Sequence, residues 1–571
     1  MQGFFCLLTT GNAPLPRSFS LLIGILFLSF AVNAQTSVSN SVEPNRFEGY
    51  LTMRIEGYAV DGIPDRYEPF TWLISGTPTL YLGGIKMPLR IQAGNLGINR
   101  FGQPFNKFGI SPTGSWWKLH FGHSNLNWSP FTLGGRTFLG GGFELNPGKL
   151  RLGFIYGLIQ KSIEEYSDTL LDKPPLVLFE RKGFAARVGI GNQRNYADLI
   201  FLKAWDDTAS ITTKPVPAFA TPQDNAVIGF SSRHQLAPHL RLHLDGAVSA
   251  YNQNTQSKEQ DLEDNFWSRS LKPIFTPRYA SRYSGAAEIL LNYQRRNFGI
   301  GLHYKRVDAD YQSMGAWFLQ HDVENSTIRL NLASPKSKIR LDANYGYQRN
   351  NLTHLHASNT LRQIAQVNLQ FIPAAGQFYH LQYFNYTTEL RRRRELLEDT
   401  LALNQLTQHW NAGGQWKISR SQPGDILQFE GFYRNLQDQA HPKTDLYRSY
   451  GFTASYLKQF SHFSFGGNFY LDQFRFNAIN FLRLQPGLTL MLKGMKRRLD
   501  VSARTQVGFT YRESVLQSTS IMPGLIMTLR ASDWHTLSLI VNLIRYDIPD
   551  QIQDTAFTES RGSISYTYRL H

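Results

Sequence analysis

Cysteine is almost absent from this chain, since Cys6 is the only one among 571 residues. It lies in an N-terminal segment that we expect to be removed on export. The mature chain then has no thiol, which excludes disulfides, cysteine metal sites and a cysteine nucleophile. The same absence argues against a lipoprotein, because a lipoprotein needs a cysteine directly after the apolar part of its signal.

Long apolar runs are missing after residue 35, where no stretch reaches about 18 apolar residues, so helical membrane spans are excluded. The mean hydropathy of −0.32 is also too polar for a helical bundle. Acidic residues are outnumbered, with 59 Lys and Arg against 43 Asp and Glu. Because the chain has no basic helix, Cys/His finger or RNP-like motif, we expect no nucleic-acid partner.

The first 34 residues have the pattern of an export signal. Arg17 supplies a positive charge, the apolar stretch "LLIGILFLSFAV" follows at 21–32, and Ala34 offers a cleavage point before Gln35. We therefore expect residues 1–34 to be a signal peptide.

From about residue 115 onward, segments of roughly ten residues alternate apolar and polar side chains. Ile339, Leu341 and Ala343, for example, alternate with Arg340 and Asp342. A period of two is the pattern of a β-strand with two different faces, and helical spacing fits these windows poorly.

The connections between these segments alternate in length. Short turns lie at 146–149, 192–195, 294–297, 334–338, 373–376, 421–425, 493–496 and 531–534. Longer stretches lie between them, at 162–181, 206–224, 252–282, 308–325, 389–404, 437–446 and 546–559. This alternation is typical of an outer-membrane barrel, whose periplasmic turns are tight and whose external loops are long.

We therefore predict an all-β fold: a single transmembrane up-and-down antiparallel β-barrel of about 22 strands, within a range of 20–24, in the cell outer membrane. Residues 115–571 form the barrel, and residues 35–114 form an N-terminal segment that lies in the periplasm or folds into the lumen with early strands. "NRFGQPFNKFGISPTG" at 99–114 is our candidate for a segment that occludes part of the lumen.

The chain ends in "RGSISYTYRLH", another alternating segment. We expect this strand to pair with the first one, because closure removes the edge that would expose backbone groups to lipid. Its aromatic residues, Tyr566 and Tyr568, resemble the C-terminal signal recognised by the barrel-insertion machinery. His571 departs from that signal, which usually ends in Phe or Trp.

The polar faces of the strands should line the lumen, and basic residues outnumber acidic ones there. The candidate lumen-lining residues are Arg241, His243, Lys305, Arg340, Arg362, Arg434, Arg483 and Arg504. One interpretation is a basic wall that favours anions. The other is a lumen crossed by ion pairs, with its excess charge simply solvated.

A cluster of four arginines, Arg391, Arg392, Arg393 and Arg394, lies in one of the long loops. It either contacts lipopolysaccharide phosphates or an acidic partner, or forms a solvated helix paired with the acidic residues that follow it. His120 and His123 are three residues apart, but on one strand they face opposite sides and cannot chelate together. We expect no metal site, no cofactor and, without a catalytic motif, no enzyme.

Three segments, "QPFNKFGISP", "WWKLHFGHSNLNWSPFTLGG" and "GGFELNPGKLRLGFIYG", resemble a poorly characterised group of outer-membrane barrels in the Bacteroidota. The overall plan resembles Gram-negative outer-membrane β-barrels over nearly the whole mature chain. The resemblance implies a location and leaves the activity open.

We expect a porin-like channel or transporter for small solutes with a polar, net-basic lumen. The alternative is a structural or docking subunit of an outer-membrane secretion or assembly complex, with an occluded lumen. Expected partners are outer-membrane lipid and lipopolysaccharide, the insertion machinery and, for the alternative, other envelope proteins.

Overall fold

The computed structural model describes residues 45–96, 103–165, 176–212, 216–260, 274–317, 319–336, 338–356, 358–392, 404–418, 424–439, 445–548 and 556–570. The proposed signal peptide, residues 1–34, lies outside them. Within these ranges there is no helix long and apolar enough to cross a bilayer.

The described chain is a succession of strands joined by turns and two short 3-10 turns, η1 (Thr208–Ser210) and η3 (Met495–Arg497). The first strands are β1 (Arg46–Asp61), β2 (Phe70–Gly76), β3 (Thr79–Leu82), β4 (Ile85–Gly94), β5 (Lys107–Ile110), β6 (Trp117–Asn127), β7 (Gly134–Leu145) and β8 (Leu150–Gln160). A separate two-stranded sheet contains β9 (Ile163–Glu165) and β10 (Leu176–Leu178).

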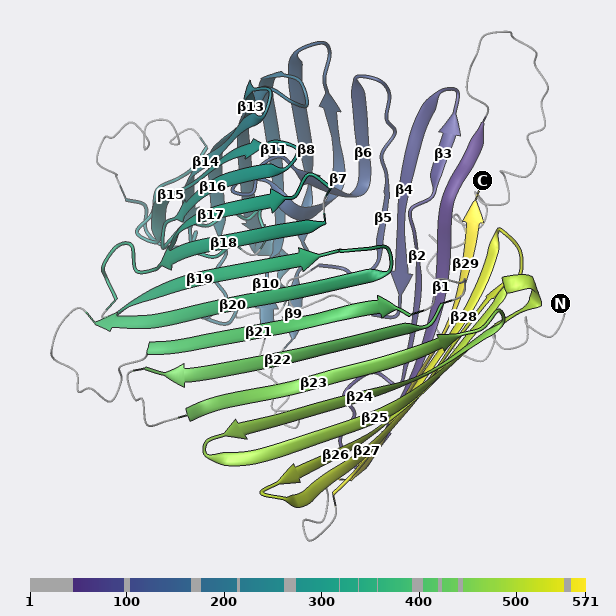
Figure 1. Cartoon of the computed structure of the whole chain (residues 1–571). Helices are drawn as coiled ribbons and strands as arrows, with labels where there is room; N and C mark the ends of the chain where they lie inside the picture. Colours follow the sequence, from purple (N-terminus) through teal and green to yellow (C-terminus); the bar gives the residue numbers. More distant parts are fainter. Residues whose placement is uncertain are drawn as a thin grey trace. The chain divides into compact units, whose positions relative to one another are not determined.

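The main sheet then continues without interruption (Figure 1). Its middle strands are β11 (Glu180–Gly191), β12 (Tyr196–Asp207), β13 (Asp224–Ala237), β14 (Leu240–Asn252), β15 (Ser281–Gln294), β16 (Phe298–Val307), β17 (Val323–Ala333), β18 (Ile339–Arg349), β19 (Ser358–Phe371) and β20 (Gln377–Arg392). Its last strands are β21 (Asn404–Lys417), β22 (Ile426–Asp438), β23 (Asp445–Gln459), β24 (Phe463–Phe476), β25 (Ile479–Gly494), β26 (Leu499–Arg512), β27 (Val515–Arg530), β28 (His535–Asp547) and β29 (Phe557–Leu570).

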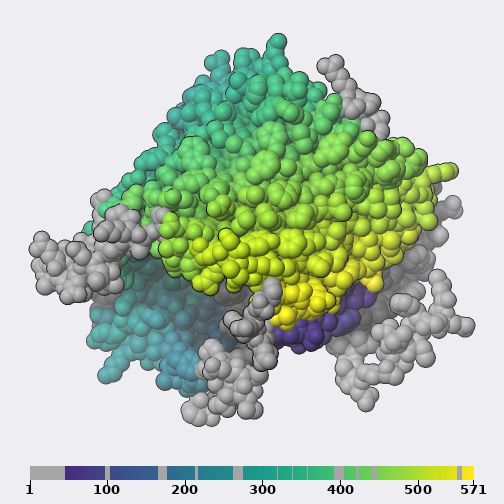
Figure 2. Space-filling model, turned by 60° about the horizontal axis from the view of Figure 1, so that its bottom comes forward, coloured from purple at the N-terminus to yellow at the C-terminus, as the bar shows by residue number. Residues whose placement is uncertain are grey.

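The sheet closes on itself through its first and last strands. β1 pairs antiparallel with β29 from Gly49 opposite Leu570 to Asp61 opposite Thr558. Figure 2 shows the C-terminal strand, in yellow, against the N-terminal strand, in purple. The predicted role of the terminal segment in closure is confirmed: it removes the sheet edge and satisfies its backbone groups.

The predicted antiparallel barrel is confirmed, but the predicted strand number is wrong. The closed sheet contains 27 strands. Because β2 and β3 both pair with β1 on one side and β4 on the other, they share one position, and the barrel has 26 positions. The strands from β6 to β29 account for the predicted 22, and residues 46–110 supply the other four.

The N-terminal part of the chain therefore belongs to the wall. The wall begins at Arg46, earlier than the predicted barrel start at residue 115. The candidate occluding segment at 99–114 contains β5, which pairs with β4 and β6. Residues 97–102 lie outside the described ranges. The N-terminal strands escape the alternating pattern because Pro78 breaks one of them in two and β5 has only four residues.

The alternation of connection lengths separates two ends of the barrel. Residues 146–149, 192–195 and 295–297 join neighbouring strands at one end, which we call the short-turn end. The connections from 208 to 223 and from 308 to 322 lie at the other, which we call the long-loop end. Both ends of the barrel chain, Arg46 and Leu570, lie at the short-turn end, as an even number of positions requires.

The two faces of the wall differ as a membrane requires. Alternate residues expose large apolar side chains: Leu199 on β12 is 58% exposed and Phe452 on β23 is 44% exposed. Their neighbours Asp198, Ile200 and Thr453 point the other way. Lipid-spanning barrels put apolar residues outside, so the face with Leu199 and Phe452 is the exterior and the opposite face lines the lumen.

This assignment predicts very different costs for one charge on adjacent residues of β23. Phe452→Arg places a cation on the lipid face and should destabilise the folded barrel by about 2–4 kcal/mol. Thr453→Arg faces the lumen beside Glu430 and should change stability by less than about 0.5 kcal/mol. Urea titrations of barrels folded in lipid vesicles measure both, and equal losses would contradict the assignment of the faces.

Candidate functional site

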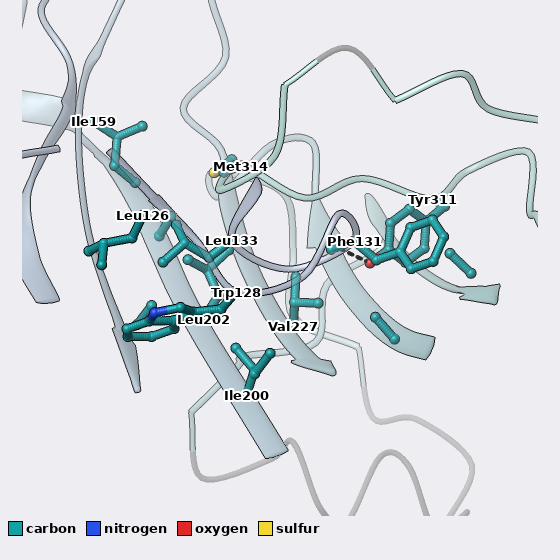
Figure 3. Packing of buried hydrophobic residues seen from close by; sticks show 14 of the residues in the cluster. Leu126, Trp128, Phe131, Leu133, Ile159, Ile200, Leu202, Val227, Tyr311 and Met314 are labelled. Carbon is teal, nitrogen blue, oxygen red and sulfur yellow. Dashed lines mark hydrogen bonds between the residues drawn. The ribbon is translucent and has the colours of Figure 1, made fainter. Parts of the chain in front are cut away.

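Two connections of the long-loop end fold into the lumen instead of outward. They are the β6–β7 loop, residues 128–133, and the described part of the β16–β17 loop, residues 308–317 and 319–322. Phe131 and Leu133 of the first loop and Tyr311 of the second have no exposed surface. They belong to one buried cluster with Ile200, Leu202 and Val227 of the wall, part of which Figure 3 shows. Together we call these two segments the lumen loops.

Hydrogen bonds join the two lumen loops directly. The Tyr311 hydroxyl donates to the Phe131 carbonyl at 2.7 Å, the contact drawn in Figure 3. The Ser313 hydroxyl donates to the Thr132 carbonyl at 2.7 Å. Because Tyr311 is buried, its pKa is raised and the hydroxyl stays protonated and able to donate. The loops therefore form one unit.

Side chains of the wall fix this unit in place. Asn225 on β13 accepts a hydrogen bond from the Met314 backbone N–H at 3.0 Å, and its amide donates to the Gln312 carbonyl at 3.3 Å. The Arg136 guanidinium on β7 lies 4.0 Å over the Trp317 ring. The two Asn225 hydrogen bonds satisfy backbone groups that a loop inside a barrel would otherwise leave unpaired.

Two glycines let the loops approach this closely. A Cβ on Gly315 would lie 2.6 Å from the Thr132 carbonyl oxygen and 2.9 Å from the Leu202 side chain. A Cβ on Gly229, in β13, would overlap the Thr132 methyl group. At both positions a side chain would push the loop away from the wall.

The lumen loops cover a large part of the inner wall. The buried cluster around them includes residues from ten strands, β6 to β8 and β11 to β17, out of 26 positions. A barrel of this width cannot fill its lumen with wall side chains alone. Each of these ten strands thus contributes at least one lumen-facing residue to the buried cluster that contains the two lumen loops.

A buried ionic network lies on the lumen side of the same strands. Arg151 of β8 donates to both carboxylate oxygens of Asp198 of β12, at 2.7 and 2.9 Å. Arg187 of β11 lies 3.9 Å from Asp198 and 3.2 Å from Glu144 of β7. Glu144 also contacts His120 of β6, at 3.0 Å. The network thus links five side chains from five strands of the wall.

The network also contacts the β6–β7 loop. Trp128 donates its indole N–H to Glu144 at 3.3 Å, and the Arg187 guanidinium lies 5.0 Å over the Trp128 ring. The ring fits over Gly153 of β8, where a Cβ would lie 2.6 Å from it. Buried charges need partners of opposite charge, so the network ties the position of the loop to the wall.

The wall beyond the lumen loops is different, because charged side chains there are exposed to the lumen. Arg340 on β18, Arg434 on β22 and Arg504 on β26 are exposed. Among the described residues none of these three has an ion-pair partner. Their guanidinium groups are therefore available to solutes in the lumen.

The structure places all eight candidate lumen residues on the lumen face by strand register. They are Arg241 and His243 of β14, Lys305 of β16, Arg340 of β18, Arg362 of β19, Arg434 of β22, Arg483 of β25 and Arg504 of β26. They do not form one cluster. His243 pairs with Asp245 at 2.9 Å, and Lys305 lies beside the lumen loops, 5.7 Å from the Phe131 ring.

The other residues singled out in the sequence lie at different places in the structure. His120 points into the lumen and contacts Glu144, whereas His123 on the same strand accepts a hydrogen bond from the Phe108 backbone N–H at 3.0 Å. Arg391 and Arg392 end β20, and Arg393 and Arg394 lie outside the described residues. Their predicted contact with lipopolysaccharide or an acidic partner stays a prediction.

Sequence reasoning missed the lumen loops and the network. The sequence pattern predicts an external loop at 308–325, whereas the structure folds its described part into the lumen. The signal was present: "WSPFTL" at 128–133 and "YQSMGAW" at 311–317 are unusually apolar for solvent-facing loops. Polar residues on the strands cannot be sorted into paired and solvated groups without the register.

No protein-family model matches the chain, and no curated protein matches it. Solved structures of other proteins are similar to it over most of the chain. The P pilus usher translocation pore has 10% identity and a TM-score of 0.35, over 91% of this chain and 98% of that one. The FrpB iron transporter from Neisseria meningitidis has 7% identity and a TM-score of 0.34, over 91% and 81%.

A BenF-like porin from Pseudomonas fluorescens is also similar, with 9% identity and a TM-score of 0.30 over 93% of this chain and 100% of that one. These neighbours are Gram-negative outer-membrane barrels. The closed antiparallel cylinder and its apolar exterior define the class on their own. The chain is a β-barrel of the outer-membrane type, as predicted.

Proposed function

We propose that the protein is a porin-like channel that passes small solutes along the part of its lumen wall not covered by the lumen loops. The observation that carries this proposal is the set of exposed arginines on that wall, Arg340, Arg434 and Arg504. Fixed cations on a low-dielectric wall concentrate anions near it, so the channel favours anionic solutes.

The membrane orientation follows the usual plan of such barrels, with the short-turn end in the periplasm and the long-loop end outside. In this orientation the lumen loops enter from the external side. Arginines at the end of β20 would then lie at the level of lipopolysaccharide phosphates. Membership of the Bacteroidota barrel group, and the absence of enzymatic activity, stay predictions.

Single-channel recording in planar bilayers tests the proposal. The purified barrel should carry a sustained current, and its reversal potential in a KCl gradient should show a preference for chloride. Arg340→Glu combined with Arg504→Glu should shift the reversal potential toward the cation value, because both side chains face the lumen. The matched control, Arg545→Glu on the outer face of β28, should leave it unchanged.

The alternative function is that of a docking subunit with a closed lumen. The extent of the lumen loops is the observation that favours this alternative. It predicts no current from the purified barrel and a stoichiometric partner co-purified from native membranes. A sustained current without such a partner would contradict it.

A further inference from the structure

Aromatic side chains interrupt the polar lining of the lumen on β20 to β26. The register gives one row of lumen-facing residues across all seven strands, each residue opposite the next. The row is Phe384, His409, Arg434, Ser449, Phe474, Phe481 and Arg512. A neighbouring row is Gln382, Asn411, Phe432, Gly451, Asp472, Arg483 and Thr510. We call these two rows the aromatic track.

Ring contacts hold the side chains of the track in order. Phe474 and Phe481 stack at 4.8 Å with an interplanar angle of 8°. Phe432 stacks with Tyr470, the next lumen-facing residue of β24, at 6.1 Å and 22°. The Phe432 ring lies over Gly451, where a Cβ would overlap it. A glycine at this position thus lets the ring lie along the wall instead of projecting into the lumen.

Each ring group carries a guanidinium. Arg434 lies 4.7 Å from the Phe432 ring and Arg483 lies 5.6 Å from the Phe474 ring. The hydroxyl of Ser449 on β23 donates a hydrogen bond to the buried carboxylate of Asp472 on β24 at 2.6 Å. This bond fixes one acidic side chain in the wall. Ring faces, guanidinium groups and short polar side chains therefore alternate along the track.

The dimensions indicate a ligand with several rings. Seven strands spaced about 4.8 Å apart give a track of about 29 Å. Because barrel strands are tilted by roughly 40°, a row perpendicular to them climbs along the lumen as well as around it. A solute that moves along the track therefore also moves through the barrel.

We propose that the aromatic track binds acidic oligosaccharides. This proposal rests on the proposed channel function and names the class of substrate that the channel passes. The apolar face of a pyranose ring stacks on Phe432 or Phe474, its carboxylate bonds to Arg434 or Arg483, and its hydroxyl groups bond to polar residues such as Gln382 and Thr510. A single planar aromatic acid would use the rings and cations but leave these polar groups unused.

Block of the open-channel current by added solute tests this proposal. A short oligogalacturonate should reduce the current at lower concentration than a neutral maltooligosaccharide of equal length, and galacturonate monomer should be weaker. Phe432→Leu with Arg434→Gln should raise the half-blocking concentration of the oligogalacturonate by about tenfold, because each change removes one stacking or charge contact. The control pair Phe452→Leu and Arg545→Gln removes one ring and one cation from the outer face of the wall and should leave the half-blocking concentration unchanged.

Several results would overturn the proposal. Equal block by the neutral oligosaccharide would remove the role of the arginines, and block by benzoate alone would assign the track to aromatic acids. A current that no solute blocks would leave the channel intact and refute the track. If the barrel carries no current, calorimetric titration of oligogalacturonate into the detergent-solubilised barrel still decides: binding that the double variant loses supports the track, and absence of binding refutes it.

Discussion

Replacement of Arg187 by alanine should lower the free energy of unfolding by about 3–5 kcal/mol, because removing one partner of a buried ion pair leaves the others uncompensated. The Arg187 side chain is 7% exposed and lies between the carboxylates of Asp198 and Glu144. It also covers the Trp128 ring. The variant would therefore lose both charge pairing and the packing that holds the β6–β7 loop.

The control is Arg340→Ala, which removes an arginine from the same side of the wall, where it is exposed and has no ion-pair partner among the described residues. It should change stability by less than about 0.5 kcal/mol. Urea unfolding of both variants in lipid vesicles, followed by tryptophan fluorescence, measures the difference. If the two variants lose the same amount, the network does not stabilise the barrel.

The charges of the network show where sequence reasoning reaches and where it stops. A period of two predicts that Arg187 and Arg340 face the same side of a sheet, and both do. The same period cannot predict that one of them is buried among carboxylates from other strands and the other is exposed. That difference depends on which strands become neighbours and on loops that cover one part of the wall.

The number of strands could likewise be predicted from the sequence only in part. From β6 onward each strand is long, alternating and bounded by turn residues, so about 22 strands could be counted from the sequence. Before β6 the local signals are weaker, because Pro78 interrupts one strand and β5 spans only Lys107–Ile110. Closure with β29 supplies the partner that makes β1 a strand.

The residues of the candidate site could also be predicted from the sequence only in part. Alternation places Phe432 on the same face as Arg434, and Phe481 on the same face as Arg483. Only the register shows that rings and arginines from different strands lie in line with one another. The lumen loops were missed because their apolar residues come from connections about 180 residues apart.

Replacement of residues 311–317 by a Gly/Ser linker of equal length should raise the single-channel conductance at least about twofold, because the lumen loops line ten of the 26 wall positions and a wide barrel without such filling is open. The replacement removes Tyr311, whose hydroxyl bonds to the β6–β7 loop, and Ser313, which does the same. Both loops then lose their mutual support, and the current should also become noisier.

The matched control replaces residues 64–68, a connection of the same end whose side chains are exposed, with a Gly/Ser linker of equal length, and it should keep the wild-type conductance. An unchanged conductance in the 311–317 variant would show that ions do not pass beside the lumen loops. A silent wild-type barrel that becomes conductive in this variant would identify the loops as a closure. The proposed open channel would then give way to a gated or docking barrel, because the arginine-lined wall would be reached only after these loops move.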